Sequence, residues 1–211
     1  INTGSATLSG TTTVNAVSGV ATFTNLKLTG TKGQHTLRFS ISDPRSITKN
    51  WLVEMSAGAA TQMVFIQEPA GAKNRLAFTT QPIIEVRDIS GNAENVTVSV
   101  SAGATTYPGS TPSANVMSTG RATFYDLAIK GPASTTGYTL TFTHQDSAIP
   151  AITKTLALAA GTATKLGINN NSITSASDAV ISPAPVVTIQ DVDGNVVSDT
   201  NKTIEVVIAG P

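Results

Sequence analysis

Apolar and polar side chains alternate in short runs along this chain, which is the pattern of half-buried β-strands. In the run 96–101 every second residue is valine, and in the run 139–143 Leu140 and Phe142 alternate with threonine. Proline, glycine and asparagine separate such runs, and no stretch has the period of an amphipathic helix. The pattern therefore predicts an all-β protein. Further strands are expected at 63–66, 83–87 and 152–158, and at 122–124 and 127–129 with a bulge or kink between the two.

The strand pattern also repeats along the sequence. The segment 82–92 returns 103 residues later as 185–195, and the segment 19–26 returns as 120–127. A repeat of this length is the size of a domain. About seven short strands per repeat, with no helix between them, are typical of an antiparallel sandwich of the immunoglobulin type. The sequence therefore predicts tandem immunoglobulin-like β-sandwiches.

This repeat divides the chain into one complete copy and two partial ones. We expect residues 61–163 to form a complete domain, residues 1–60 the C-terminal part of a domain, and residues 164–211 the N-terminal part of a further domain. Together the two partial copies amount to roughly one domain. Two explanations fit this division: the chain is one stretch of a longer tandem array, or separate copies complete each other head to tail by donated strands.

The composition argues against several classes of function and of site. Basic and acidic side chains number 13 each, so no electrostatic footprint for nucleic acid is present. No run of 18 apolar residues occurs, so membrane insertion of this segment is not expected. The absence of cysteine excludes disulfides, thiolate metal sites and a cysteine nucleophile. The two histidines lie in different repeats, beside no plausible nucleophile, so we expect no enzyme.

Short motifs in the complete copy carry a family resemblance. They are Ala60-Thr61-Gln62-Met63-Val64-Phe65, Phe78-Thr79-Thr80-Gln81-Pro82, Asp88-x-x-Gly91-Asn92, Gly120-x-Ala122-Thr123-Phe124 and Gly137-Tyr138-Thr139-Leu140. With these motifs the chain resembles the tandem bacterial immunoglobulin-like repeats, of the invasin and intimin type, of large microbial surface proteins. The resemblance implies display at the cell surface or outside the cell, in an adhesin or in a stalk that holds a distal head.

One segment comes close to a metal motif. Asp191, Asp193 and Asn195 alternate with other residues, and oxygen ligands at alternate positions are what calcium loops use. Counting from Asp191, however, the glycine and glutamate that an EF-hand needs at its sixth and twelfth positions are missing. A glycine–asparagine turn explains the segment and its earlier copy, 88–92, with glycine at a positive backbone angle. We favour the turn, and keep calcium as the alternative; no other cofactor is expected.

Four further residues are candidates for modification or for a structural role. Asn95, Asn170 and Asn201 begin sequons for N-linked glycosylation, which are usable only in a eukaryotic secretory protein. Tyr138 follows a glycine at the start of a strand, where immunoglobulin-like folds often place a tyrosine corner. The earlier repeat has histidine at this position, which weakens the tyrosine-corner assignment for that copy.

These observations favour a non-enzymatic, extracellular structural repeat that builds a stalk, fibre or surface-layer filament from stacked domains. Its expected partners are neighbouring immunoglobulin-like domains of the same array, or identical subunits arranged head to tail, with glycans at the sequons. The alternative is an adhesin module whose loops contact a host protein or glycan. Tyr107 and Tyr125 are the aromatic candidates for such contacts.

Overall fold

The structure is a computed structural model, and it describes residues 5–42, 44–45, 47–94, 99–102, 106–107, 113–115, 119–169, 173–198 and 201–210. Its described residues form β-strands, turns and irregular segments, all strand pairs being antiparallel apart from one isolated parallel bridge. This confirms the predicted all-β antiparallel class. Within these ranges no helix is long and apolar enough to cross a membrane.

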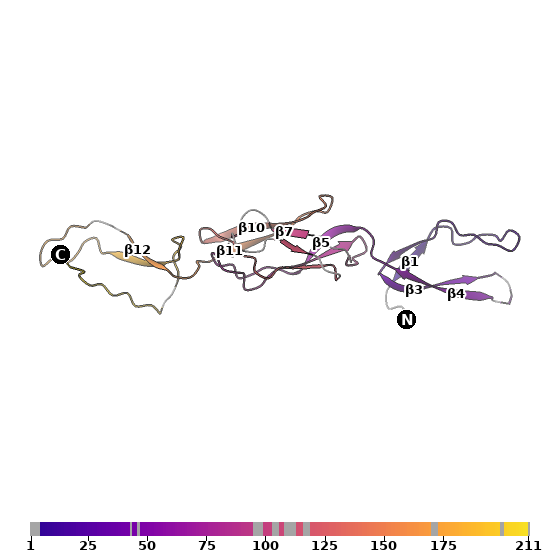
Figure 1. The fold of residues 1–211 in the computed structure, drawn as a ribbon, viewed down its shortest axis with the longest axis horizontal. Coiled ribbons are helices and arrows are strands. Elements are labelled where there is room, and N and C mark those ends of the chain that lie inside the picture. The colour runs from indigo at the N-terminus through magenta and orange to yellow at the C-terminus, as the bar shows by residue number, and fades with distance from the viewer. Residues whose placement is uncertain are drawn as a thin grey trace.

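Three groups of strands follow one another along the long axis of the molecule, with the N-terminal and C-terminal groups at opposite ends (Figure 1). The N-terminal part contains two strand pairs, β1 with β2 and β3 with β4. Their bounds are Ala6–Ser9 for β1, Lys27–Gly30 for β2, Gly33–Ser40 for β3 and Thr48–Met55 for β4.

The central part contains two sheets. One has the strand order β5-β6-β9 and the other has the order β11-β10-β7-β8. The bounds are Ala60–Gln67 for β5, Ile83–Asp88 for β6, Ser99–Ala102 for β7, Ser113–Asn115 for β8, Arg121–Thr123 for β9, Ser134–His144 for β10 and Ile152–Leu158 for β11.

A single hydrophobic core joins these two sheets, as in a β-sandwich. Ile84 and Val86 of β6 face the core from one sheet, and Leu140 and Phe142 of β10 face it from the other; all four are completely buried. The ring of Phe142 meets the rings of Phe65 and Phe124 edge-on, at 5.4 and 5.7 Å. The rest of the core consists of Met63, Ala72, Phe78, Ala122, Leu127, Ile129, Ile149, Leu156 and Leu158.

The C-terminal part has one strand pair, β12 (Lys165–Asn169) with β13 (Val186–Gln190). Its register copies that of β5 and β6: Leu166 pairs with Ile189, as Met63 pairs with Val86. Both residues of the second pair lie 103 positions before those of the first. The 103-residue spacing of the sequence is thus also a spacing in strand register.

The N-terminal part copies the other half of the central part in the same way. Leu37 pairs with Trp51 across β3 and β4, and Leu140 pairs with Lys154 across β10 and β11, again 103 positions later. The sequence predicts strand at 122–124 and again at 127–129, and of these the structure forms the strand Arg121–Thr123. Ala128 and Ile129 make isolated bridges instead, since they pair with irregular chain rather than with a strand.

Candidate functional site at the two junctions

The turn after β6, residues 88–92, contacts the linker that enters the central part, residues 56–60. The carboxylate of Asp88, which is buried, accepts hydrogen bonds from the peptide N–H groups of Ser90 and Asn92 at 2.9 and 2.8 Å. It also accepts the N–H of Gly58 in the linker at 2.8 Å and the side-chain amide of Asn92 at 2.9 Å. Gly91 makes the turn possible with a φ of 83°. One carboxylate therefore ties the turn to the linker.

Asn92 connects this turn to the N-terminal part. Its side-chain N–H donates to the carbonyl of Gly30 at 2.9 Å, and its side-chain oxygen accepts the N–H of Lys32 at 2.8 Å. The ammonium of Lys32 donates to the carbonyl of Ala93 at 2.7 Å. Gly30 and Lys32 flank the turn between β2 and β3, so the contact joins two consecutive parts of the chain.

The second junction repeats this network. Asp191, only 1% exposed, accepts the N–H of the linker residue Gly161 at 2.9 Å and the side-chain amide of Asn195 at 2.8 Å. Asn195 in turn donates to the carbonyl of Gly131 at 3.1 Å and accepts the N–H of Ala133 at 2.7 Å. The Asp-x-x-Gly-Asn motif is therefore the part of each repeat that fastens it to the preceding one.

Two residues of the central part strengthen the second junction. The side-chain amide of Asn74, itself buried, donates to Asp191 at 2.8 Å and to Asp193 at 2.7 Å, and its oxygen accepts the N–H of Gly131 at 3.0 Å. Arg75 binds both carboxylate oxygens of Asp193, each at 2.6 Å. A two-pronged guanidinium–carboxylate pair fixes orientation as well as distance. The second junction is therefore the more strongly fastened of the two.

The junction carboxylates are held in the charged form. Burial raises the pKa of Asp88, but hydrogen bonds from Asn92 and Gly58 outweigh it and leave that pKa below its usual value. Burial likewise raises the pKa of Asp191, and hydrogen bonds from Asn195, Gly161 and Asn74 bring it well below the usual range. Hydrogen bonds from Arg75 and then Asn74 lower the pKa of Asp193 to about 2.

Lowered carboxyl pKa values predict the pH dependence of the junctions. Their stabilisation is fully present above the unfolded-state pKa of about 3.9 and is lost as the pH falls through the folded-state values. We expect the length of the particle, measured by small-angle X-ray scattering, to stay constant from pH 7 to about pH 5 and to change below about pH 4. A change between pH 7 and pH 5 would contradict this assignment.

The calcium candidates Asp191, Asp193 and Asn195 come together at this junction. Their oxygens, however, accept hydrogen bonds from N–H donors, and the carboxylate of Asp193 is bound on both oxygens by Arg75. Calcium takes six to eight oxygen ligands, so an ion here would have to displace these donors. Across the described ranges, no group of three or more histidine, cysteine, aspartate or glutamate residues could hold a metal ion. The geometry is that of a hydrogen-bonded turn, with Gly194 at a φ of 90°.

Tyr138 lies at the same end of the central part. Its hydroxyl donates to the carbonyl of Pro132 at 2.9 Å, which is the backward hydrogen bond of a tyrosine corner. A Cβ at Gly131 would lie 2.4 Å from that hydroxyl, so the ring needs a glycine there. The earlier repeat keeps the contact with another side chain: the Nε2 atom of His35 lies 2.8 Å from the carbonyl of Thr31. His35 and Tyr138 thus each contact a backbone carbonyl at the same place in their repeats.

We predict that Tyr138→Phe lowers the free energy of unfolding of the central part by about 1 kcal/mol, because one hydrogen bond is lost while the ring stays packed. Urea denaturation followed by circular dichroism measures this difference. Tyr125→Phe is the matched control, since Tyr125 is 80% exposed. Equal stabilities of the two variants would contradict a structural role for the Tyr138 hydroxyl.

The remaining candidate residues are distributed over the surface or lie outside the described residues. Asn201 is exposed in a turn, whereas Asn95 and Asn170 lie outside the described residues. Tyr107 stacks beneath the guanidinium of Arg75, whose central carbon is 5.6 Å from the ring centre. Tyr107 therefore belongs to the surroundings of the second junction.

The sequence did not indicate the hydrogen bonds that join this motif to the preceding part, or the participation of Asn74 and Arg75. One signal was available: Gly58 and Gly161 recur 103 residues apart, in step with Asp88 and Asp191. Across the junctions, Asn92 and Asn195 bond backbone atoms of the preceding part, and backbone atoms leave no mark in side-chain identity.

No protein-family model matches the chain, and no curated protein sequence matches it significantly.

Proposed function

We propose that this chain is a non-enzymatic structural module, in which immunoglobulin-like β-sandwiches stack end to end into a stalk, fibre or surface filament outside the cell. The observation that carries this proposal is the recurrence of one hydrogen-bond network at both junctions. A flexible connection between independent domains needs no such network, because loosely linked domains share few contacts. A repeated fastening instead sets the same relation between each domain and the next.

The linkers support close stacking. They are the small-residue segments 56–60 and 159–163, and each donates a glycine N–H to the buried aspartate of the next repeat. A Cβ at Gly161 would lie 2.5 Å from the carbonyl oxygen of Asn74. The second linker therefore passes too close to the central part for any larger residue. Bending at such a junction requires breaking hydrogen bonds to a buried carboxylate.

Several features support the immunoglobulin-like family within this proposal. The central part has two antiparallel sheets over one core, the tyrosine-corner hydrogen bond, and glycine turns at repeat spacing. The motifs resembling bacterial surface repeats occupy these elements. An extracellular location fits the low charged fraction of 12% and the absence of cysteine. It also fits the many threonine and serine residues in the strands.

The alternative function is an adhesin module, and one observation favours it. Tyr125 is 80% exposed beside β9, as a ligand-contacting aromatic would be. A glycan array and a panel of extracellular-matrix proteins test this alternative directly. Binding that is abolished by Tyr125→Ala would establish the adhesin function. If the chain binds neither panel, the adhesin function is ruled out for these ligands and the structural proposal stands.

The structural proposal is tested by removing the contacts that join consecutive parts. We expect the double variant Asn92→Ala and Asn195→Ala to bend at both junctions, so that its maximum dimension in small-angle scattering falls and its distance distribution broadens. Asn25→Ala is the matched control, because among the described residues the side chain of Asn25 bonds Thr11, within the N-terminal part itself. An unchanged scattering profile in the double variant would contradict the proposal.

A further inference from the structure

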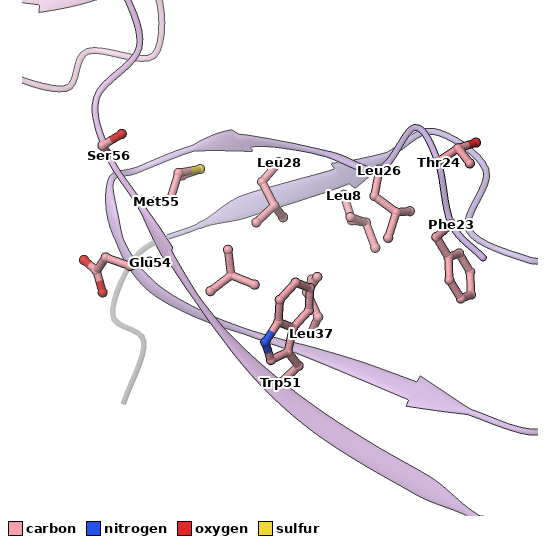
Figure 2. A pocket seen from close by; sticks show the side chains of 11 residues that line it. Leu8, Phe23, Thr24, Leu26, Leu28, Leu37, Trp51, Glu54, Met55 and Ser56 are labelled. Carbon is pink, nitrogen blue, oxygen red and sulfur yellow. The ribbon is translucent and has the colours of Figure 1, made fainter. Parts of the chain in front are cut away.

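The outer face of the sheet β5-β6-β9 differs in chemistry from the open groove of the N-terminal part. Apolar side chains line that groove, and Figure 2 shows Leu8, Leu28 and Leu37 pointing into it from the core-facing sides of their strands. The core-facing side of the sheet β5-β6-β9 is covered by β10 and β11. On its outer side, charged side chains are bonded to one another.

Three charged side chains form a triad on this outer face. The neighbours of Glu85 along β6 point into the core, so Glu85 and Arg87 point outward. Arg121 of β9 lies directly opposite Glu85 in the strand register. The Nε atom of Arg87 donates to one carboxylate oxygen of Glu85 at 2.7 Å, and the Nε atom of Arg121 donates to the other at 2.8 Å.

The carboxylate of the triad is buried, whereas the two guanidinium groups remain open to solvent. The side chain of Glu85 is 8% exposed, and those of Arg87 and Arg121 are 32% and 49% exposed. Burial raises the pKa of Glu85, but hydrogen bonds from Arg121 and Arg87 outweigh it and leave that pKa below its usual value. Two guanidinium groups and one carboxylate therefore leave a surplus positive charge at the surface.

The arginines also keep hydrogen-bond donors that Glu85 does not use. A guanidinium group carries five N–H donors in one plane, and each arginine gives its Nε donor to Glu85. Among the described residues, the terminal nitrogens of Arg87 and Arg121 have no further hydrogen-bond or ion-pair partner. Glu85 thus fixes the orientation of both groups, while their other donors stay available. Paired N–H donors of this kind match the oxygens of a sulfate or a carboxylate group.

The acidic side chains that flank β5 and β6 do not compete for these donors. Glu68, which follows β5, pairs with Lys154. Glu94 accepts the N–H of Ala60 at 3.3 Å, and Asp88 accepts N–H groups of the turn and of the linker. The surplus charge of the triad is therefore left for a ligand from outside the chain.

The other repeats indicate that a strand at this place does not need the charges. At the positions of Glu85 and Arg87, 103 residues later, the C-terminal part has Thr188 and Gln190. The side-chain amide of Gln190 donates to the hydroxyl of Thr188 at 3.0 Å, so the contact is kept in uncharged form. The N-terminal part has valine at the position of Arg121. The triad is thus a feature of the central repeat and not of the strand pattern.

We propose that Arg87 and Arg121 form a binding site for the sulfate or carboxylate groups of an acidic polysaccharide. The two oriented guanidinium groups supply the charge and the paired donors. Tyr125 follows β9 by two residues and is 80% exposed, so its ring is open to the apolar face of a sugar. Nucleic acid is disfavoured as the ligand, because the chain has no excess of basic over acidic side chains.

This site adds a ligand to the proposed structural module, and it names a ligand class for the adhesin alternative. The binding of a polysaccharide to one sheet face does not require the junctions to be rigid. The scattering test of the junctions and the binding test of the triad use different variants, so either proposal can fail while the other stands.

Biolayer interferometry of the 211-residue chain over immobilised polymers tests the site. We expect binding to dextran sulfate, to polygalacturonate or to both, and none to uncharged dextran. The two acidic polymers distinguish sulfate from carboxylate as the bound group. Failure to bind either of them would overturn the proposal. Equally tight binding to single-stranded DNA would also overturn it, because the site would then not select a polysaccharide.

The double variant Arg87→Gln with Arg121→Gln should bind the acidic polymer at least about tenfold more weakly, because charge-assisted hydrogen bonds from both groups are lost. Arg38→Gln with Lys49→Gln is the matched control, since it removes the same charge from exposed positions of β3 and β4. Equal weakening in the two double variants would show an effect of total charge alone and would overturn the proposal.

A further variant separates ligand binding from a role in folding. It carries Glu85→Thr, Arg87→Gln and Arg121→Val, the residues that the other repeats have at these positions. We expect an unchanged circular dichroism spectrum and the same loss of polymer binding as in the double arginine variant. If this variant unfolds, while the double arginine variant stays folded and binds like the unchanged chain, the triad is a structural element and the proposal is wrong.

Discussion

Replacing Asp191 with alanine is expected to uncouple the C-terminal part from the central part. Asp191 is buried and accepts five hydrogen bonds, from the peptide N–H groups of Gly161, Asp193 and Asn195 and from the side chains of Asn74 and Asn195. Its removal leaves these donors without their shared acceptor. Hydrogen bonds to a charged group contribute about 1.5–3 kcal/mol each at most, and their effects overlap. We expect a loss of about 3 kcal/mol of junction free energy.

Limited proteolysis within 159–163 measures this loss, because a junction that opens more often exposes its linker. A change of about 3 kcal/mol corresponds to a roughly 100-fold faster cleavage. Asp146→Ala is the matched control: the carboxylate of Asp146 accepts the N–H of Ala148 in an exposed turn away from the linker. If both variants are cleaved at the rate of the unchanged chain, Asp191 does not hold the junction.

Replacing Phe142 with alanine is expected to have the largest effect on folding. Phe142 of β10 is completely buried, and its ring meets those of Phe65 and Phe124, which lie in and next to the strands of the opposite sheet. Truncating such a ring costs about 3–5 kcal/mol, from lost burial and from the cavity that remains. For a domain of this size, the melting temperature of the central part should fall by at least about 12 °C, as measured by calorimetry.

Phe39→Ala provides the comparison at the same repeat position. Phe39 meets Phe23 and Trp51 at 5.5 and 6.3 Å, but it is half-buried, because none of the described strands covers it as β5 covers Phe142. We expect a loss of about 1 kcal/mol or less for single chains. Equal losses for Phe39→Ala and Phe142→Ala would show that the N-terminal part is already a closed sandwich by itself.

Local patterns predicted much of the fold because strands depend on nearest-neighbour alternation. The expected strand 152–158 coincides with β11, and the expected strand 83–87 is extended by one residue in β6. The turn glycines Gly91 and Gly194 take the positive φ angles that the repeated motif indicates. Each of these features is set by residues close together in the chain.

The junctions could not be predicted in the same way, because their contacts join distant segments through backbone atoms. Asn195 bonds the carbonyl of Gly131 and the N–H of Ala133, neither of which depends on side-chain identity. Asn74 and Arg75 lie in a loop whose later copy reads Ser177 and Asp178, so the repeat did not single them out. Three-dimensional proximity alone assigns them to the junction.

The central claim is that consecutive parts of the chain are held in a fixed relation to each other. Double electron–electron resonance, which measures the distance between two spin labels, tests this claim most directly. The chain has no cysteine, so Thr153→Cys on the exposed side of β11 and Asn169→Cys at the end of β12 provide unique label sites. Dilution with unlabelled chain removes distances between copies. We predict one narrow distance distribution, which Asp191→Ala broadens. A broad distribution in the unchanged chain, matching that of the Asp191→Ala chain, would contradict a rigid array.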